Sequence, residues 1–436
     1  MAQVLVIGAG VMGLAAAYQA AVDGHQVDVI EAAPEPGGMA GHFDFDGDSI
    51  ERFYHFVCHT DYPTFDLLQE LGIPHLLHWV PTSMGFYTEG RLNLWGNPIA
   101  LLKLPGVSLM SKFRYGLLAF ISVRRDTWPA LEEQSAKDWI LRWCGEDVYR
   151  RFWKTLFEFK FYEYTDNISA AWIWTRIRRI GRSRKSLMQE ELGYIEGGSK
   201  TLVDALIHNI ESRGGRVHLG CPVQCVTTDN NHVTGAATAA RHFEADFVIS
   251  TAPTPYISAM VPDLPEDWKA RYRSIHNIGV ICVIFKLKRQ VTPHFWVNVS
   301  VPEIGIPGVV ELSNLRKGIT NTIVYVPYYM PITNEKFSWD DQRLLDEAFD
   351  CLRLLNPQLV ADDIIAGKVA RLKHGQPICE PGFAAKIPPV QTPIRGLQIA
   401  DTCFYYPEDR GIAESVRLGR SMARTVSAQA HSVQAE

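Results

Sequence analysis

Gln3-Val-Leu-Val-Ile-Gly-Ala-Gly-Val-Met-Gly13 stands near the start of the chain, and the run Val27-Asp-Val-Ile30 ends in Glu31, eighteen residues after the last glycine. Apolar runs, a glycine turn and a helical stretch in this order predict a strand, a turn, a helix and a second strand. Gly8 permits the tight turn, Gly10 lets a pyrophosphate approach the backbone, and Gly13 lets the helix pack close to the strand. The pyrophosphate then lies at the helix N-terminus, where N–H groups are free, and Glu31 is placed to accept hydrogen bonds from an adenosine ribose. We predict a dinucleotide site here rather than a chance glycine turn.

The bulk composition is that of an ordinary soluble globular protein. The chain has 436 residues, of which 47% are hydrophobic and 21% charged, so we expect two domains. A net charge of −5 gives no reason to expect a nucleic-acid partner. We interpret the basic residues at 176–185 as a solvated helix face. The eight cysteines include no CxxC pair, and the first predicted strand begins at residue 3, so we expect reduced thiols, no leader segment and a cytoplasmic location.

No apolar run reaches the roughly eighteen residues needed to span a bilayer. The nearest approach is the stretch 98–123, which Lys103, Pro105, Lys112 and Arg114 interrupt. A packed helical hairpin is the favoured interpretation. The alternative is a surface that dips into a membrane interface, with basic residues among apolar ones, and thus peripheral membrane contact.

The order of elements predicts an α/β fold in which the chain leaves the nucleotide-binding domain and returns to it twice. A Rossmann-like domain is expected from residues 1–90, 190–260 and 390–436, and a substrate-binding domain with a mixed sheet and helices from 91–189 and 261–389. Periodicity and glycine caps predict helices at 62–72, 202–210, 340–355 and 411–428. Strands are predicted at 217–219, 232–238, 247–251, 278–287 and 321–328. The stretch 100–188 has helical signals and is rich in aromatic residues.

Three separated segments together resemble the superfamily of flavin-dependent amine oxidases, protoporphyrinogen oxidases and phytoene desaturases. They are Gly8–Gly13 with Glu31, the loop from Glu31 to Gly37-Gly38, and Gly396–Asp401 followed by Pro407–Arg420. Gly197-Gly198 and Cys221-Pro222-Val223 also match that family's internal return to the nucleotide domain. The resemblance implies FAD rather than NAD, because a plain dehydrogenase needs neither the double-glycine loop nor the C-terminal return.

The resemblance also implies roles for individual residues. Gly37 and Gly38 would let the backbone pass close to the flavin, and Val223 would meet the adenine through its main chain. Asp401 would bond the ribityl or phosphate region, unless it is a simple helix cap, and the helix beginning near Gly411-Ile412 would point its positive end at the flavin's pyrimidine edge. The full set of predicted cofactor-binding residues is Gly8, Gly10, Val11, Met12, Gly13, Glu31, Ala32, Gly37, Gly38, Met39, Val223, Asp401, Gly411 and Ile412.

The chain departs from the family pattern in two places. Met39-Ala40-Gly41-His42 replaces the basic residue that often follows the double glycine. The lysine that amine oxidases carry near the flavin would fall at Ile281 or Cys282, while Lys286 and Lys288 lie too far along the strand, so an amine substrate is not expected. One further stretch, Phe53–Asp61, is similar to the histidine loop of UDP-galactopyranose mutases, which also bind FAD.

We therefore expect an FAD-dependent oxidoreductase that removes hydride from an apolar or cyclic small molecule, with the flavin reoxidised by oxygen or another acceptor. Two alternatives stay open: a non-oxidative flavoenzyme of the mutase type acting on a nucleotide sugar, and a flavin-fold protein that only binds a partner. No metal site is predicted, and the sequence does not fix the oligomeric state. The candidate pocket residues, none with an assigned catalytic role, are Tyr54, His55, Lys160, Tyr325, Tyr328 and Gln376.

Overall fold

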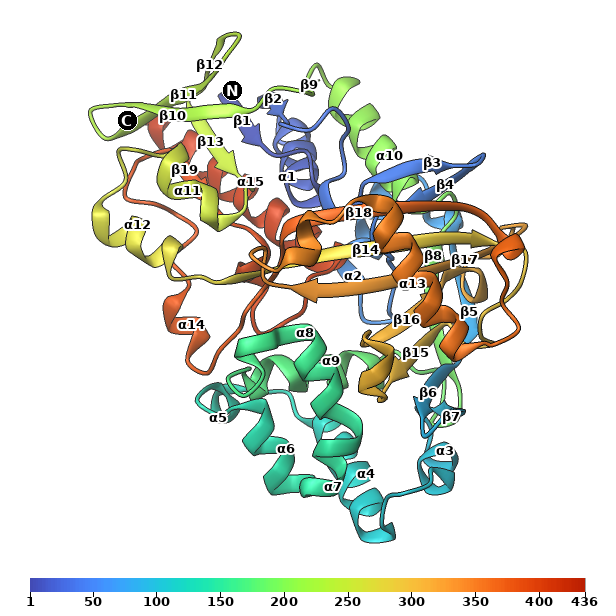
Figure 1. Cartoon of the computed structure of the whole chain (residues 1–436). Helices are drawn as coiled ribbons and strands as arrows, with labels where there is room; N and C mark the ends of the chain where they lie inside the picture. The colour runs from blue at the N-terminus through green and yellow to red at the C-terminus, as the bar shows by residue number, and fades with distance from the viewer. Residues whose placement is uncertain (436) are drawn as a thin grey trace.

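A five-stranded parallel sheet carries the first glycine turn (Figure 1). The computed structural model describes residues 1–435. Strand order in this sheet is β19-β13-β1-β2-β9, and every pairing is parallel. Its strands are β1 (Gln3–Ile7), β2 (Gln26–Ile30), β9 (Arg216–His218), β13 (Phe247–Ser250) and β19 (Leu397–Ile399). Because these strands come from distant parts of the chain, the expected discontinuous domain is present as one sheet.

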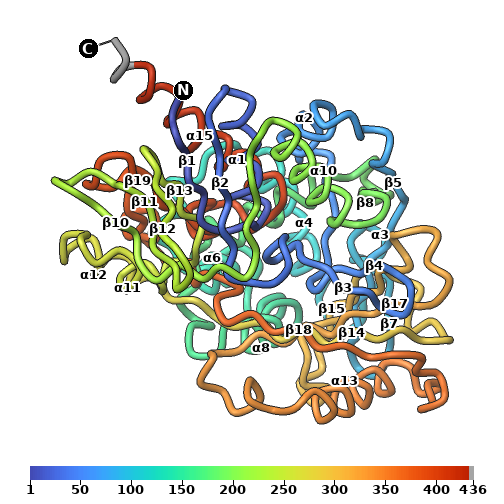
Figure 2. The backbone as a smooth tube through the Cα atoms, turned by 90° about the horizontal axis from the view of Figure 1, so that it is seen from above, coloured from blue at the N-terminus to red at the C-terminus, as the bar shows by residue number. Residues whose placement is uncertain are grey.

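Helices cover the parallel sheet and bring the chain ends together. The longest, α15 (Ile412–Ala435), lies beside α1 (Val11–Val22) in both views (Figures 1 and 2). The two helices approach so closely that a Cβ at Gly419 would lie 2.2 Å from the Met12 carbonyl oxygen. The remaining helices of this half are α2 (Tyr62–Glu70), α10 (Ser199–Glu211), α11 (Thr254–Met260) and α12 (Glu266–Arg273). A three-stranded antiparallel sheet lies at its edge: β10 (Val223–Asp229), β11 (His232–Thr238) and β12 (His242–Glu244).

A seven-stranded mixed sheet forms the centre of the other half. Strand order is β18-β14-β17-β16-β15-β6-β7, with β15 and β6 parallel and the other pairs antiparallel. Helix α13 (Asp341–Leu355) packs on one face, and the hairpin of β3 (His42–Phe45) and β4 (Asp48–Glu51) packs on the other. The strands are β6 (Met84–Thr88), β7 (Arg91–Trp95), β14 (Asn277–Leu287), β15 (Trp296–Val299), β16 (Gly308–Glu311), β17 (Thr322–Met330) and β18 (Ile364–Pro377).

The aromatic stretch that the sequence predicts as helical forms a group of helices below this sheet (Figure 1). Its core contains buried tryptophan and phenylalanine side chains, among them Trp139, Phe157, Phe161, Trp172 and Trp174. The helices are α3 (Pro98–Lys103), α4 (Leu109–Arg124), α5 (Pro129–Glu132), α6 (Ala136–Cys144), α7 (Glu146–Val148), α8 (Thr155–Phe161) and α9 (Ala170–Arg182). The last elements are the pair β5 (Leu77–Thr82) and β8 (Glu190–Ile195) and the short α14 (Phe383–Lys386).

The predicted α/β class is confirmed, and the predicted helices and strands are present within a few residues at each end, except that the last helix runs to Ala435 and not to 428. The boundary predicted at residue 90 falls in the turn between β6 and β7, and both strands belong to the seven-stranded sheet. That sheet therefore takes up residues before 90, which the sequence assigned to the nucleotide-binding segment. None of the helices in residues 1–435 is long and apolar enough to cross a membrane.

Candidate functional site

The turn between β1 and α1 has the geometry that its glycines predict. Gly8 has φ +106°, and a Cβ there would lie 2.5 Å from Thr251 Oγ1. A Cβ at Gly13 would lie 1.9 Å from the Gly8 carbonyl oxygen. Side chains are therefore excluded at both positions by the protein itself, and the helix starts directly against the strand.

Gly10 is different, because nothing in the protein fills the space beside it. Its φ of −72° suits any residue, and the nearest atom to an added Cβ is the Gly38 Cα at 4.0 Å. The double-glycine loop lies alongside, with the Gly37 N–H donating to the Ala9 carbonyl at 2.8 Å. No side chain caps the N-terminus of α1. Two bare backbone segments thus face each other next to free helix N–H groups, which is the arrangement that binds phosphate.

The Glu31 carboxylate is held beside this turn. Its Oε2 accepts from the Ala9 N–H and its Oε1 from the Ala33 N–H, both at 2.8 Å. The loop before β10 runs next to it, because the Cys221 N–H donates to the Glu31 carbonyl at 2.8 Å. Val223, two residues further on, begins β10. The segments predicted for the ribose and the adenine are therefore adjacent.

At the C-terminal return, Asp401 caps two elements. Its Oδ2 accepts from the Thr254 N–H at the start of α11 (2.7 Å), and its Oδ1 accepts from the Cys403 N–H (2.9 Å). Asp401 is buried, so these two bonds fix the loop that leads to α15. That helix begins at Ile412, directly after Gly411, as the sequence predicts. The capping alternative for Asp401 is present in the structure, and contact with the cofactor stays a prediction.

A group of charged and aromatic side chains, here named the cationic cluster, lies just before the start of α15. It consists of Lys160 on α8, Arg176 on α9, Tyr329 on β17, and Asp409 and Arg410. Arg176 Nη2 lies 2.6 Å from Asp409 Oδ1, and the Lys160 Nζ lies 4.7 Å from the centre of the Tyr329 ring. Arg410 donates to the Gly375 carbonyl and lies 5.9 Å from the same ring. Among the described residues, only Arg176 of these three basic side chains makes an ion pair with Asp409.

Burial and mutual repulsion shift the protonation of this cluster. Burial, together with the positive charge of Arg176, holds the pKa of Lys160 well below its usual value. Burial would raise the pKa of Asp409, but Arg176, Lys160 and Arg410 outweigh it and lower that pKa. The cluster thus keeps its carboxylate ionised and makes its lysine readily deprotonated, which is the combination that a site for an anion or a proton acceptor requires.

The cationic cluster contains one of the six pocket candidates and touches a second. Lys160 belongs to it, and the Tyr54 hydroxyl lies 3.5 Å from that of Tyr329. The Tyr54 ring also packs edge-on against Trp296 and Tyr325, at 5.3 and 5.9 Å between ring centres.

The other candidates are held by the surrounding protein in different ways. The Tyr325 hydroxyl donates to the Glu51 carbonyl at 2.9 Å, which is a structural bond. His55 Nδ1 and Gln376 Oε1 are buried and have no hydrogen-bond partner in the described chain. Burial lowers the pKa of His55 and so favours its neutral form.

The prediction for Tyr328 is wrong by one position. Its side chain is on the face of the sheet covered by α13, with its hydroxyl 4.0 Å from Cys351 Sγ and Lys336 4.7 Å from its ring centre. Successive side chains of a strand point to opposite faces. Tyr329 is therefore the residue that faces the cationic cluster.

The interpretation of 176–185 as a solvated helix face is also wrong. Each of its basic side chains has a carboxylate within 4.0 Å, as Arg176 has Asp409 and Arg179 has Asp61. Sequence reasoning missed Arg176, Tyr329, Asp409 and Arg410. Asp409 and Arg410 lie within the C-terminal motif quoted above, and their charges were the sequence feature that could have marked them as candidate site residues.

The position expected for an amine-oxidase lysine is apolar. Cys282 lies on the sheet face that also carries Tyr325, and Ile281 lies on the opposite face. The nearest lysine on the same face of β14, Lys286, has its Nζ 2.9 Å from Asp48 Oδ2 and 3.3 Å from Asp46 Oδ2. Its amine is therefore engaged at the β3–β4 hairpin.

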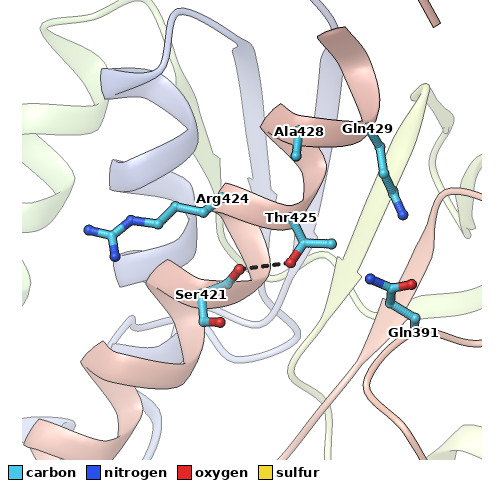
Figure 3. A pocket seen from close by; sticks show the side chains of 6 residues that line it. All are labelled: Gln391, Ser421, Arg424, Thr425, Ala428 and Gln429. Atoms are coloured by element: carbon cyan, nitrogen blue, oxygen red, sulfur yellow. Dashed lines mark hydrogen bonds between the residues drawn. The ribbon is translucent and has the colours of Figure 1, made fainter. Parts of the chain in front are cut away.

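A surface hollow of about 450 Å³ lies far along α15 from this cluster (Figure 3). It is lined by Gln391, Ser421, Arg424, Thr425, Ala428 and Gln429. Arg424 points away from Gln391, and the Thr425 hydroxyl donates to the Ser421 carbonyl of its own helix (Figure 3). No acid–base pair lines it, so we do not assign the function there.

Comparison with known proteins identifies the family. The family model described as flavin containing amine oxidoreductase matches residues 12–369, which include the helix after the glycine turn, the double-glycine loop and most of the seven-stranded sheet. The chain belongs to the flavin-containing amine oxidoreductase family. Membership confirms FAD as the cofactor. The bare backbone beside Gly10 and the uncapped helix fit the FAD pyrophosphate.

Individual relatives are distant. The chain is 26% identical to a zeta-carotene desaturase of Zea mays over 320 residues, which cover 65% of this chain and 55% of that protein. It spans about half to two thirds of the length of the first curated relatives it matches. Cyclohexylamine oxidase from Brevibacterium oxydans superposes with a TM-score of 0.75 at 16% identity, covering 99% of each chain. A reduced UDP-galactopyranose mutase gives 0.76 at 16% identity, covering 98% of this chain and 94% of its own. These structures show a shared fold.

Proposed function

We propose that this flavoprotein removes hydride from a ring-bearing or apolar small molecule that carries an acidic group. One observation carries the proposal: the cationic cluster has two arginines, a lysine of lowered pKa and one carboxylate among aromatic side chains. An excess of positive charge that is partly removed from water is costly unless an anion compensates it. A carboxylate or phosphate on the substrate would supply that anion, and the aromatic rings would contact its apolar body.

In this proposal one half of the chain binds FAD and the other half binds the substrate. The parallel-sheet half, built from segments near 1–83, 190–260 and 390–436, would hold FAD. The seven-stranded sheet and the helices α3–α9 would hold the substrate. FAD, when bound, supplies the acceptor for the hydride, and oxygen or another compound would take the electrons afterwards.

The chain's own residues would position the substrate and move a proton. Arg176 and Arg410 would hold the acidic group, and Tyr54 with Tyr329 would exclude water from the reacting carbon. Lys160, whose pKa is lowered by burial and by Arg176, would accept a proton at Nζ where the substrate loses one next to the hydride. The reaction class then resembles the desaturation named for the Zea mays relative.

A second function is favoured by the same charges. A nucleotide sugar carries a diphosphate, which the two arginines of the cluster would also bind, and Phe53–Asp61 is similar to the histidine loop of the mutases. In that case the flavin would cycle with no net transfer of electrons. Consumption of an electron acceptor during turnover separates the two functions.

The test is anaerobic mixing of the FAD-loaded protein with ring-bearing acids and, in parallel, with their methyl esters, while the flavin absorbance is followed. We expect the acids to bleach the flavin. The esters should bleach it at least about tenfold less effectively, because an ester lacks the charge for one charge-assisted hydrogen bond. Lys160→Met should reduce flavin bleaching by acids. The matched control is Lys336→Met, because Lys336 also lies 4.7 Å from a tyrosine ring but on the opposite face of the sheet. Equal bleaching by acids and esters would contradict the charge argument. A flavin that none of these compounds bleaches would contradict hydride removal and leave the mutase and binding-partner alternatives.

A further inference from the structure

Large apolar side chains are exposed along one short part of the chain. Among the residues whose side chains the structure describes, 20 large apolar ones are exposed, and nine of them lie between residues 92 and 120. On α4, Leu109 is 73% exposed, Met110 and Phe113 are each 67% exposed, and Phe120 is 52% exposed. The remaining five are Leu92, Leu94, Ile99, Leu102 and Leu117. Monomeric proteins rarely gather exposed apolar residues in this way without using the surface.

The exposed residues follow the repeat of a helix. Leu109, Phe113, Leu117 and Phe120 are spaced by four, four and three residues, so they lie along one face of α4. The opposite face packs on the protein: Leu118 is buried, and the Trp174 Nε1–H donates to the Ser122 carbonyl at 3.0 Å. The apolar stripe of α4 therefore faces solvent, which is the reverse of an ordinary surface helix.

The hairpin of α3 and α4 is held firmly in this position. The Lys112 Nζ donates to the Leu102 carbonyl (2.7 Å) and ties the two helices together. Arg114 donates to the Trp143 and Arg142 carbonyls (2.6 and 2.8 Å) and ties α4 to the end of α6. Figure 1 shows both helices at the end of the molecule opposite the parallel sheet. The stripe is thus a fixed, protruding surface.

The charge of this stretch is of one sign. Residues 91–125 contain no aspartate or glutamate, in a chain whose net charge is −5. They contain six basic residues, and within the described part of the chain none of the six makes an ion pair. These are Arg91, Lys103, Lys112, Arg114, Arg124 and Arg125. An apolar stripe with exposed cations near it, here Arg91, Lys103 and Arg124, matches the interface of a membrane with anionic headgroups.

We propose that the α3–α4 hairpin is a docking surface for an anionic lipid bilayer, with Leu109, Met110 and Phe113 inserted among the acyl chains. Lys103 and Arg124, at the ends of the two helices, contact the headgroups. A second copy of this chain fits less well, because it would bring the exposed cations Arg91, Lys103 and Arg124 against their own counterparts. The inference does not depend on the proposed function, since lipid binding needs no substrate.

The experiment is co-sedimentation of the FAD-loaded protein with vesicles. Vesicles of phosphatidylcholine alone are compared with vesicles that contain phosphatidylglycerol. We expect binding to the anionic vesicles that weakens as NaCl is raised, because salt shortens the range of surface charges from about 10 Å at 0.1 M to 3 Å at 1 M. Met110→Ser with Phe113→Ser should weaken the partitioning at least about tenfold. Lys103→Gln with Arg124→Gln should weaken binding to anionic vesicles only.

The matched control is Leu354→Ser with Val360→Ser, which removes two apolar side chains that are 52% and 53% exposed elsewhere. This variant should bind vesicles like the unmodified protein. The proposal is overturned if the unmodified protein binds neither kind of vesicle, or if the hairpin and control variants bind equally. It is also overturned if the protein binds no vesicle and the hairpin variant only turns a dimer into a monomer, because the occupant would then be a second copy. A fluorescence spectrum of bound FAD, unchanged in every variant, shows that the fold is intact.

Discussion

Replacing Gly10 by alanine should separate cofactor binding from folding. Gly10 has φ −72° and ψ 170°, which alanine adopts without strain, and the nearest atom to its new Cβ is 4.0 Å away. A glycine-to-alanine change at such a position stabilises a protein by about 0.4–1 kcal/mol, because the unfolded chain loses freedom. The cofactor-free variant should therefore be as stable as the unmodified protein or slightly more so.

The same methyl group should weaken FAD binding. It would lie where the sequence predicts that the pyrophosphate approaches the backbone, and one displaced charge-assisted hydrogen bond is worth about 1.5–3 kcal/mol. The dissociation constant should rise by roughly 10- to 150-fold. Urea unfolding of the cofactor-free protein and a fluorescence titration with FAD measure the two quantities.

Gly13→Ala is the matched control. Its Cβ would lie 1.9 Å from the Gly8 carbonyl oxygen, so it should cost at least about 1–3 kcal/mol of stability before any cofactor is added. If Gly10→Ala binds FAD as tightly as the unmodified protein, the pyrophosphate does not pass beside Gly10 and the reasoning fails.

Three further changes test other parts of the structure. Burial raises the pKa of Glu311 to about 8 from an ordinary value of 4.5, so stability is fully present below about pH 4.5 and is lost as the pH rises through about 8. In the unmodified protein the free energy of unfolding should therefore fall by a few kcal/mol between pH 5 and 9. In Glu311→Gln it should not fall, so the urea midpoint should stay constant over this range. If the variant keeps the pH profile of the unmodified protein, Glu311 does not titrate there. Asp409→Asn should lower the free energy of unfolding by about 1–3 kcal/mol, because it leaves Arg176 without its carboxylate. The cost is smaller than for a fully buried ion pair, since Arg176 is 27% and Asp409 21% exposed. A urea midpoint equal to that of the unmodified protein would refute this. Tyr329→Phe should lower kcat/KM for flavin reduction about tenfold, and Tyr328→Phe should lower it less than about twofold. Equal effects would contradict the placement of Tyr329 on the sheet face of the cationic cluster and of Tyr328 on the opposite face.

The parts of the site that could be predicted from the sequence are local. Gly8, Gly10 and Gly13 act within one turn, and a strand, a turn and a helix fix their geometry without help from the rest of the chain. The double-glycine loop could be placed because its partner, the backbone at Ala9, belongs to the same short segment. Local chemistry of this kind is visible as a pattern.

The cationic cluster could not be predicted in the same way. Arg176 and Asp409 are 233 residues apart, and their pairing depends on how α9 packs below the sheet. The sequence could not show which of Tyr328 and Tyr329 faces the site, for a different reason. Because β17 is buried on both faces, its sequence does not alternate between apolar and polar residues, and the phase of the strand is hidden.

The strand order of the parallel sheet also determines when this half of the protein can finish folding during synthesis. Strand β19 and helix α15, which complete this half, leave the ribosome about 390 residues after β1. At roughly 5–20 residues per second, β1 waits about 20–80 s for them. Until then the apolar side of α1 that α15 covers, including the surface at Met12, has no neighbour. The packing of this half is therefore completed only after these elements have been made, and a translation product interrupted before them exposes the apolar surface of α1.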